Sequence, residues 1–218
     1  MALRIDRAQS TGEQGIPLWL RIGFLGCTGI AIGVVLRRIS ALLNPSHAAP
    51  PQLAALDGFF ASHTALTLAH IIPALVFVVL AAVVVLRPQT QSGIAGQVIY
   101  PLGAVVGITA YAMSVDSVGG WTERSAVLFF NSLFLYSMFR AWRYRVKSDE
   151  PLERRWLLRG VAILLGIATT RPVMGVFFAT SPLTHLTPHQ FFGIAFWIGF
   201  SINMLIFELW IRSRRRTA

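Results

Sequence analysis

Charged residues are scarce in this chain of 218 residues. Asp, Glu, Lys and Arg make up 13% of it, about half the share of an ordinary soluble domain, whereas 55% of the residues are hydrophobic. A soluble domain of this size needs far more charge to cover its surface. The composition therefore excludes an ordinary soluble protein and indicates that much of the apolar surface faces lipid.

Cysteine is also scarce, because Cys27 stands alone and inside an apolar run. A single cysteine excludes an intramolecular disulfide, a thiolate metal cluster and the covalent attachment of a c-type haem. Acidic residues number 9 against 19 Lys and Arg, but the basic residues fall between apolar runs and form no nucleic-acid-binding motif. We therefore expect no nucleic-acid partner, and we attribute the net charge of +10 to membrane orientation.

The chain also lacks the short motifs of common enzymes. It has no glycine-rich phosphate loop, no nucleophile elbow, no HExxH motif and no paired carboxylates in its apolar runs. A metal site is not expected either, because Pro188 separates His185 from His189 and no acidic residue is near them. The sequence therefore predicts no catalytic residues and a non-enzymatic protein.

Six apolar runs reach or approach the roughly 20 residues that a helix needs to cross a bilayer. They predict an all-α integral membrane bundle of six transmembrane helices, because the runs are too long and too uniformly apolar for outer-membrane strands. The predicted helices span residues 16–36, 62–86, 94–115, 125–142, 156–179 and 189–211. Residues 1–15 are the predicted N-terminal tail, and residues 212–218 are a basic C-terminal tail.

The basic residues predict the orientation of the bundle. They are densest between the fourth and fifth predicted helices and in the C-terminal tail, and the positive-inside rule assigns both regions to the cytoplasm. Two crossings separate them, so the assignments agree and predict cytoplasmic termini, although Arg37 and Arg38 fall at the outer end of the first helix. We expect a multi-pass protein of the bacterial cytoplasmic (inner) membrane. The fourth loop is predicted to bind anionic lipids or an acidic partner domain through Arg140, Arg143, Arg145, Lys147, Arg154 and Arg155.

Two ionisable residues lie at matching depths in the last two predicted helices. Arg159 is about one turn into the fifth helix, and Glu208 is about one turn from the end of the sixth. A short loop joins these helices, which are therefore expected to be antiparallel neighbours. We predict a structural ion pair between the two residues, with proton handling as the alternative.

A polar layer is predicted in the outer half of the membrane. Arg171 lies roughly 10 to 15 Å from the outer end of the fifth helix, and a buried guanidinium needs carbonyls, a counter-ion or water. Asp116 and Glu123 are expected in the outer loop, which leaves room in the layer for an anionic or carbonyl-bearing ligand such as a quinone, a haem propionate or a lipid headgroup. The alternative is that Arg171 caps broken backbone next to the following proline and is held by Asn131 and two neighbouring threonines. Counting along the other helices gives three further residues at about this depth: His70, Asn131 and Thr109.

Histidines on two different helices are needed to hold a b-type haem inside a bundle. His63 and His189 match best in depth, whereas His63 and His70 are two turns apart on one helix and too distant to share an iron. Bundles that bind haem usually carry such pairs deeper in the core, so haem is the less favoured interpretation. The cofactor stays open, with haem b and quinone as candidates.

GxxxG spacing occurs twice, at Gly29 and Gly33 in the first predicted helix and at Gly103 and Gly107 in the third. This spacing lets helix backbones approach closely. We expect packing within one bundle, with a dedicated dimer face as the alternative.

The last two predicted helices resemble a known family in their pattern of basic, aromatic and polar residues. The pattern consists of Arg155-Trp156-Leu157-Leu158-Arg159, then Thr169-Thr170-Arg171, then Trp197, Asn203, Glu208 and Trp210. It is similar to that of a family of bacterial multi-pass membrane proteins known as the domain of unknown function number two thousand three hundred and six, whose histidine-bearing helix is matched by His70 and Gly96. Leu152-Glu153-Arg154 stands where that family tends to have a histidine. The resemblance implies an integral membrane bundle with no assigned activity.

Three functions remain open. The first is a non-enzymatic accessory or scaffold subunit that packs against a larger respiratory or photosynthetic membrane complex, with other subunits and membrane lipids as partners. The alternatives are a quinone- or haem-binding electron carrier, and a small-molecule transporter or sensor with its site around Arg171. A scaffold predicts that protein groups alone satisfy Arg171, whereas a carrier predicts a cavity beside it.

Overall fold

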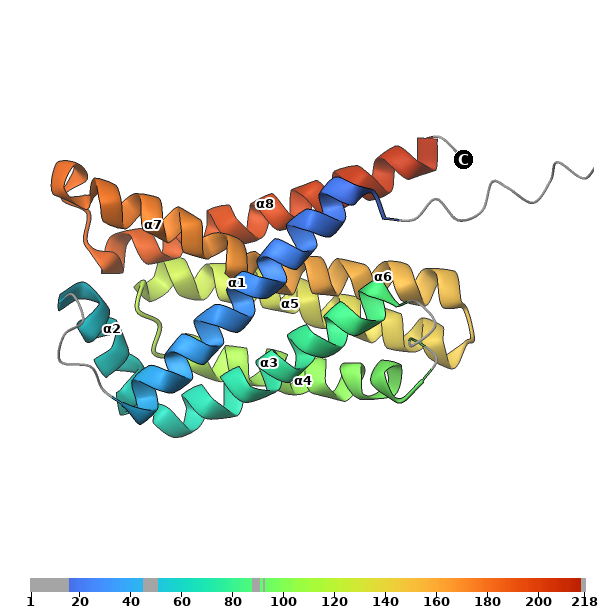
Figure 1. Ribbon diagram of the computed structural model, residues 1–218, viewed down its shortest axis with the longest axis horizontal. Coiled ribbons are helices and arrows are strands. Elements are labelled where there is room, and N and C mark those ends of the chain that lie inside the picture. Colours follow the sequence, from blue (N-terminus) through green and yellow to red (C-terminus); the bar gives the residue numbers. More distant parts are fainter. Residues whose placement is uncertain (1–15, 45–50, 88–90, 92, 217–218) are drawn as a thin grey trace, which may run out of the picture.

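The computed structural model describes residues 16–44, 51–87, 91 and 93–216, and within these ranges all regular structure is helical. The all-α class expected from the sequence is therefore confirmed. The helices run roughly along the long axis of the molecule (Figure 1). Their bounds are α1 (Leu18–Leu43), α2 (Pro51–Ser62), α3 (Thr64–Leu86), α4 (Ile94–Ser114), α5 (Gly120–Val146), α6 (Glu150–Leu164), α7 (Gly166–Thr184) and α8 (Pro188–Arg216).

Five helical stretches of the described residues are long and apolar enough to cross a membrane. They are Leu18–Leu43, Thr64–Leu86, Ile94–Ser114, Glu150–Thr184, which joins α6 to α7, and Pro188–Arg214. The fourth predicted span, residues 125–142, lies within α5, which is not among the five. Asn131 and Arg140 interrupt its apolar run and lower its mean hydropathy. A sixth crossing helix therefore stays a prediction.

Two features of the helices were not predicted. The segment before residue 62 was expected to be a linker, but it contains α2, whose 12 residues are too few to cross a bilayer. The single helix predicted over 156–179 is instead divided at Leu165, where Ala168 N–H donates to Leu165 O in a tightened turn. α7 then begins at Gly166, where a Cβ atom would lie 2.6 Å from Phe200 Cδ1. The close approach of α8 thus requires glycine at the first position of α7.

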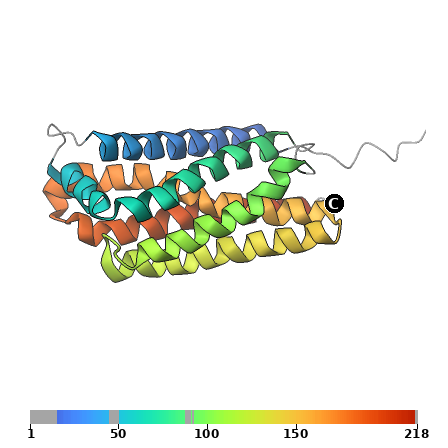
Figure 2. The same cartoon turned by 90° about the horizontal axis from the view of Figure 1, so that it is seen from below.

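Sequential helices run antiparallel and lie side by side, α3 with α4, α4 with α5, α5 with α6, and α7 with α8. α8 also packs against α5 and α6, while α1 crosses diagonally over α3 and α7 (Figures 1 and 2). The α5–α6 connection, the start of α1 and the end of α8 meet at one end of the bundle, here called the basic end. α2, the α4–α5 connection and the α7–α8 connection meet at the other end, here called the α2 end.

Aromatic side chains fill the interior between α5, α7 and α8. Phe130 stacks on Phe200 with ring centroids 5.2 Å apart, and Phe177 stacks on Phe191 at 5.3 Å. A Cβ atom at Gly199 would lie 2.6 Å from the backbone nitrogen of Thr170, so α7 and α8 are in backbone contact there. These contacts fix the position of α7 and hence the position of Arg171.

The two GxxxG pairs behave differently. Gly103 packs against Met138 and Phe77, and Gly107 packs against Leu135, so the pair on α4 serves packing within the bundle as expected. A Cβ atom at Gly29 or Gly33 of α1 would meet no described atom within 4 Å. The expectation of packing within the bundle is therefore wrong for α1, whose glycines face outward.

Candidate functional site

A cavity of about 260 Å³ lies inside the bundle near the α2 end. Every helix from α1 to α8 contributes side chains to its wall, which is mostly apolar. The ionisable and amide side chains in the wall are Arg38, His63, His70, Asp116, Glu123, Asn131 and Arg171. A mostly apolar cavity with a few convergent polar groups is the usual form of a small-molecule site.

Among the polar side chains of the cavity wall, Arg171 of α7 is the one with a buried donor that lacks a partner in the described structure. Its Nε atom is buried and has no hydrogen-bond partner among the described residues. Its Nη1 atom is 3.8 Å from the sulfur of Met174, a weak acceptor one turn further along the helix. A buried charge without a strong partner is costly, so the guanidinium has unused capacity to bind an acceptor in the cavity.

The groups expected to hold Arg171 bind elsewhere. Asn131 Nδ2 donates to Gly107 O at 2.9 Å, and Thr169 Oγ1 donates to Asn203 Oδ1 at 2.6 Å. Thr170 Oγ1 donates to Ile167 O, one turn back in its own helix. The interpretation of Arg171 as a structural group held by Asn131 and these threonines is therefore wrong.

The polar layer predicted by counting residues along the helices comes together at the cavity. His70 Nδ1 of α3 lies 2.9 Å from Thr109 Oγ1 of α4, within hydrogen-bond distance. The Thr109 hydroxyl donates to Val105 O in its own helix. His70, Asn131 and Arg171 all line the cavity from different helices. Four helices thus contribute to one polar region, with Arg171 as its charged member.

Glu123 departs from its expected place in the outer loop. It lies in the first turn of α5, lines the cavity and is only 9% exposed. Its Oε2 atom accepts a hydrogen bond of 2.5 Å from Gly119 N–H, and no bond to Arg171 is present in the described structure. The turn at Gly119 and Gly120, where Gly120 has a φ of +58°, directs the start of α5 into the bundle.

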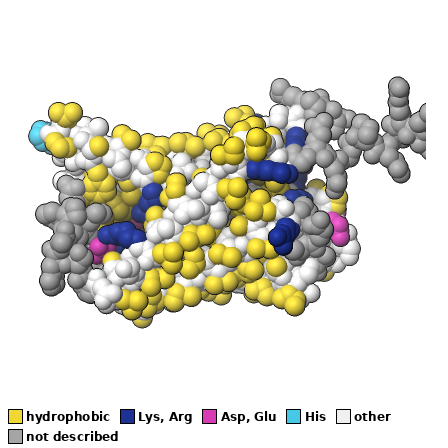
Figure 3. Space-filling model, in the orientation of Figure 1, with side chains coloured by type: hydrophobic (Ala, Val, Ile, Leu, Met, Phe, Trp, Pro, Cys, Tyr) yellow, Lys and Arg dark blue, Asp and Glu magenta, His cyan; other side chains and the backbone are white. Residues whose placement is uncertain are grey.

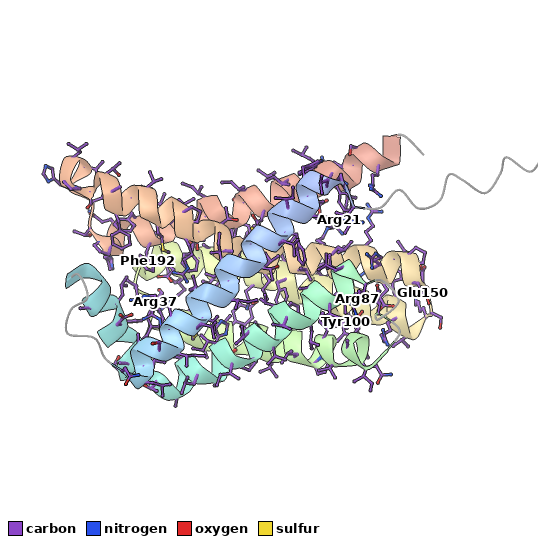
Figure 4. All side chains as sticks on the ribbon, in the orientation of Figure 1. Arg21, Arg37, Arg87, Tyr100, Glu150 and Phe192 are labelled. Carbon is purple, nitrogen blue, oxygen red and sulfur yellow. The ribbon has the colours of Figure 1, made fainter. Side chains whose placement is uncertain are left out.

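Arg37 and Arg38 form a cationic rim of the site, a position that the sequence did not predict. Both guanidinium groups donate to Asp57 of α2, with nitrogen–oxygen distances of 2.8 Å for Arg37 and 2.5 Å for Arg38. Arg38 also lies over the ring of Phe60, at 4.0 Å from the ring centroid. Arg38 and Phe60 both line the cavity. Figure 4 shows Arg37 on the part of α1 nearest α2. The positive charges of Arg37 and Arg38, which disagree with the predicted orientation, are therefore held by Asp57 of α2, a helix that was not predicted.

The histidines proposed as haem ligands have separate neighbours. His63 Nε2 lies 3.7 Å from Asp116 Oδ2, and the His63 ring lines the cavity. The His189 ring is close to Gly120, and this histidine does not line the cavity. The described residues thus do not bring His63 and His189 together as a ligand pair.

At the basic end, Arg159 and Glu208 are brought together. Arg159 Nη2 donates to Glu208 Oε2 at 3.0 Å, and Arg159 Nε donates to the other carboxylate oxygen. The guanidinium also lies over the Trp156 ring at 4.4 Å. The pair joins α6 to α8, as expected of a structural clamp between helices.

The predicted basic surface is partly internal. Arg145 pairs with the buried Glu153 at 3.1 Å, and Tyr100 Oη donates to the same carboxylate at 2.6 Å. Arg154 reaches Val85 O and the Gln91 side chain. Arg145 and Arg154 therefore connect α5 and α6 to the α3–α4 region, so both contribute to packing inside the protein. A buried carboxylate at position 153 requires this arrangement, because it needs a nearby cation. The remaining members of the set, Arg140, Arg143, Lys147 and Arg155, stay candidates for a lipid or partner surface.

Comparison with known proteins gives no relative. A scan against protein-family models, a search of curated proteins and a search of solved structures each found no match. The resemblance noted in the last two helices thus stays a prediction, supported by the residues that form its pattern.

Proposed function

We propose that this protein is a six-helix integral membrane bundle with both termini in the cytoplasm. α5 is the sixth crossing helix in this arrangement, because it runs alongside α4, α6 and α8 and is as long as the other spans. Hydrophobic side chains cover the middle of the face in Figure 3, and Lys and Arg gather toward its ends. The proposed location is the bacterial cytoplasmic membrane, with anionic lipids against the basic end.

We further propose that the protein binds a small, mostly apolar molecule in the cavity beside Arg171. The observation that supports this most strongly is the buried Arg171 Nε, which has no partner in the described structure and borders a cavity. A scaffold without a ligand has no reason to keep a costly charge at this position. The class of function supported best is therefore ligand binding within the membrane, as in a carrier, transporter or sensor.

Native mass spectrometry of gently purified protein tests this proposal. We expect the wild-type protein to carry a bound small molecule and the Arg171→Met variant to lose it. Arg21→Gln removes an exposed arginine from the other end of α1 and is the matched control, which should keep the molecule. Bare polypeptide masses for all three proteins, with no uptake of added quinone or fatty acid, would contradict ligand binding.

The electron-carrier version of this function has its own test. An absorption spectrum before and after dithionite detects a b-type haem, and extraction with solvent detects a quinone. Reduced Soret and alpha bands would identify a haem carrier. A colourless protein with extractable quinone would instead identify the quinone carrier.

A second candidate function is the accessory or scaffold subunit, and α1 favours it. Gly23, Gly26, Gly29 and Gly33 are exposed, and a Cβ atom at any of them would meet no described atom. Such a surface allows a helix of another membrane subunit to pack closely. Cysteine crosslinking at Gly33 in native membranes should give a product with a second protein, whereas crosslinking at Gly107, which packs within the bundle, should not. Absence of any crosslinked product at Gly33 would contradict this function.

A further inference from the structure

We propose that the ligand of the cavity is a single-chain amphiphile with an anionic head group, held between Arg171 and Arg38. This inference rests on the proposed ligand-binding function and names the class of ligand. Carboxylate and phosphate heads supply the same charge and hydrogen-bond acceptors, so both belong to the proposal.

The carboxylates around the cavity are engaged by groups other than Arg171. Arg38 and Arg171 line the cavity, and Arg37 is held beside Arg38 by Asp57. Asp57 is shared by Arg37 and Arg38, and Asp116 lies beside His63. An anionic head group can supply Arg171 with the carboxylate or phosphate partner that it lacks in the described structure, whereas a neutral quinone cannot.

The hydrogen bonds point to the same deficit. Asp57 accepts from both Arg37 and Arg38, and the Glu123 carboxylate accepts from Gly119 N–H. Neither acid accepts a hydrogen bond from Arg171 in the described structure. An oxyanion in the cavity supplies the acceptors that the buried guanidinium lacks, and the planar fork of an arginine suits a two-oxygen acceptor.

The rest of the wall suits a hydrocarbon chain. The cavity extends from the charged groups along side chains of α3, α4 and α5, including Leu75, Val78, Val106 and Phe134. Its volume of about 260 Å³ is near the lower limit for small-molecule sites, so it suits one chain rather than two. Figure 3 shows a hollow on the visible face in which basic and acidic side chains lie beside hydrophobic ones. Arg37, which is labelled in Figure 4, lies on this face near α2. A membrane amphiphile can therefore enter from the side of the bundle.

Equilibrium binding to the purified full chain, stripped of lipid and held in amphipol, tests the class of ligand. The probes are palmitate, a lysophosphatidate with one acyl chain, methyl palmitate and decylubiquinone, in a mildly alkaline buffer that keeps palmitate ionised. We expect an anionic probe to bind at least about tenfold more tightly than methyl palmitate and decylubiquinone, because the neutral probes lack a charge-assisted bond to Arg171.

The variants separate the inference from the function on which it rests. Arg171→Met and Arg38→Gln should each weaken the anionic probe by about tenfold or more, Arg171→Lys should weaken it less, and Arg21→Gln should leave it unchanged. Binding of palmitate alone identifies a carboxylate head, and binding of lysophosphatidate alone identifies a phosphate head. Equal or tighter binding of the neutral probes that is lost in Arg171→Met would overturn the anionic head but keep the cavity as a binding site. Failure of every probe to bind above the level of Arg171→Met would overturn both.

Discussion

Replacing Arg171 with methionine should make the ligand-free protein more stable. The Nε atom is buried without a partner, so the wild-type chain bears an uncompensated desolvation cost that a methionine of similar length removes. Replacing a buried charge by a well-packed apolar side chain stabilises proteins by about 1–4 kcal/mol in favourable cases. For a chain of this length each kcal/mol shifts Tm by about 2–4 °C, so Tm should rise by about 2–16 °C.

The measurement is thermal unfolding in detergent after removal of lipid, followed by the fluorescence of the tryptophans. Arg159→Met is the matched control, because that arginine is paired with Glu208 and its loss should destabilise the protein by about 1–3 kcal/mol. Saturating ligand should reverse the order for Arg171, since at about 100 times Kd it stabilises the wild type by about 2.7 kcal/mol and the variant hardly at all. A fall in Tm of the ligand-free Arg171→Met variant would refute the reasoning and make Arg171 a structural group.

Further perturbations test the packing. Glu153→Ala removes the buried carboxylate that accepts from both Arg145 and the Tyr100 hydroxyl, and it should cost about 3–5 kcal/mol in unfolding free energy. Gly199→Val should lower the unfolding free energy by about 2 kcal/mol or more, because the new side chain meets the α7 backbone. Gly175→Ala, with open space around it, should leave the unfolding free energy unchanged or raise it by about 0.5–1 kcal/mol. Equal effects of the two variants would contradict the contact between α7 and α8.

Several features of the fold could be predicted because they depend only on distance along a helix. The lengths of the apolar runs predict α1, α3, α4 and α8, since a bilayer sets the length of a span. The rise of 1.5 Å per residue also places His70, Asn131 and Arg171 at a common depth, and all three line the cavity. Depth is thus readable from the sequence once the spans are assigned.

Features that depend on a turn could not be predicted in this way. α2 is too short to be recognised as a membrane span, so the sequence did not predict where Asp57 lies. The partner of Arg37 and Arg38 was therefore not predicted either. Glu123 reaches the cavity because the backbone turns at Gly120, and the sequence pattern alone does not give that direction. The break at Leu165 lies next to Gly166, which contacts Phe200 of α8, and no proline or polar run marks this position in the sequence.

One error could have been avoided from helix geometry alone. Thr169 and Thr170 are two residues and one residue from Arg171 in the same helix, and side chains at these spacings do not face each other. Of these residues, Asn131 alone lies on another helix and could face the guanidinium. Its amide instead donates to Gly107 O. Gly107 has no side chain, so α5 approaches α4 closely there. With the threonines excluded in advance, the structural role of Arg171 would have depended on Asn131 alone. The decisive fact remained the position of one amide, and it depends on the packing of two helices.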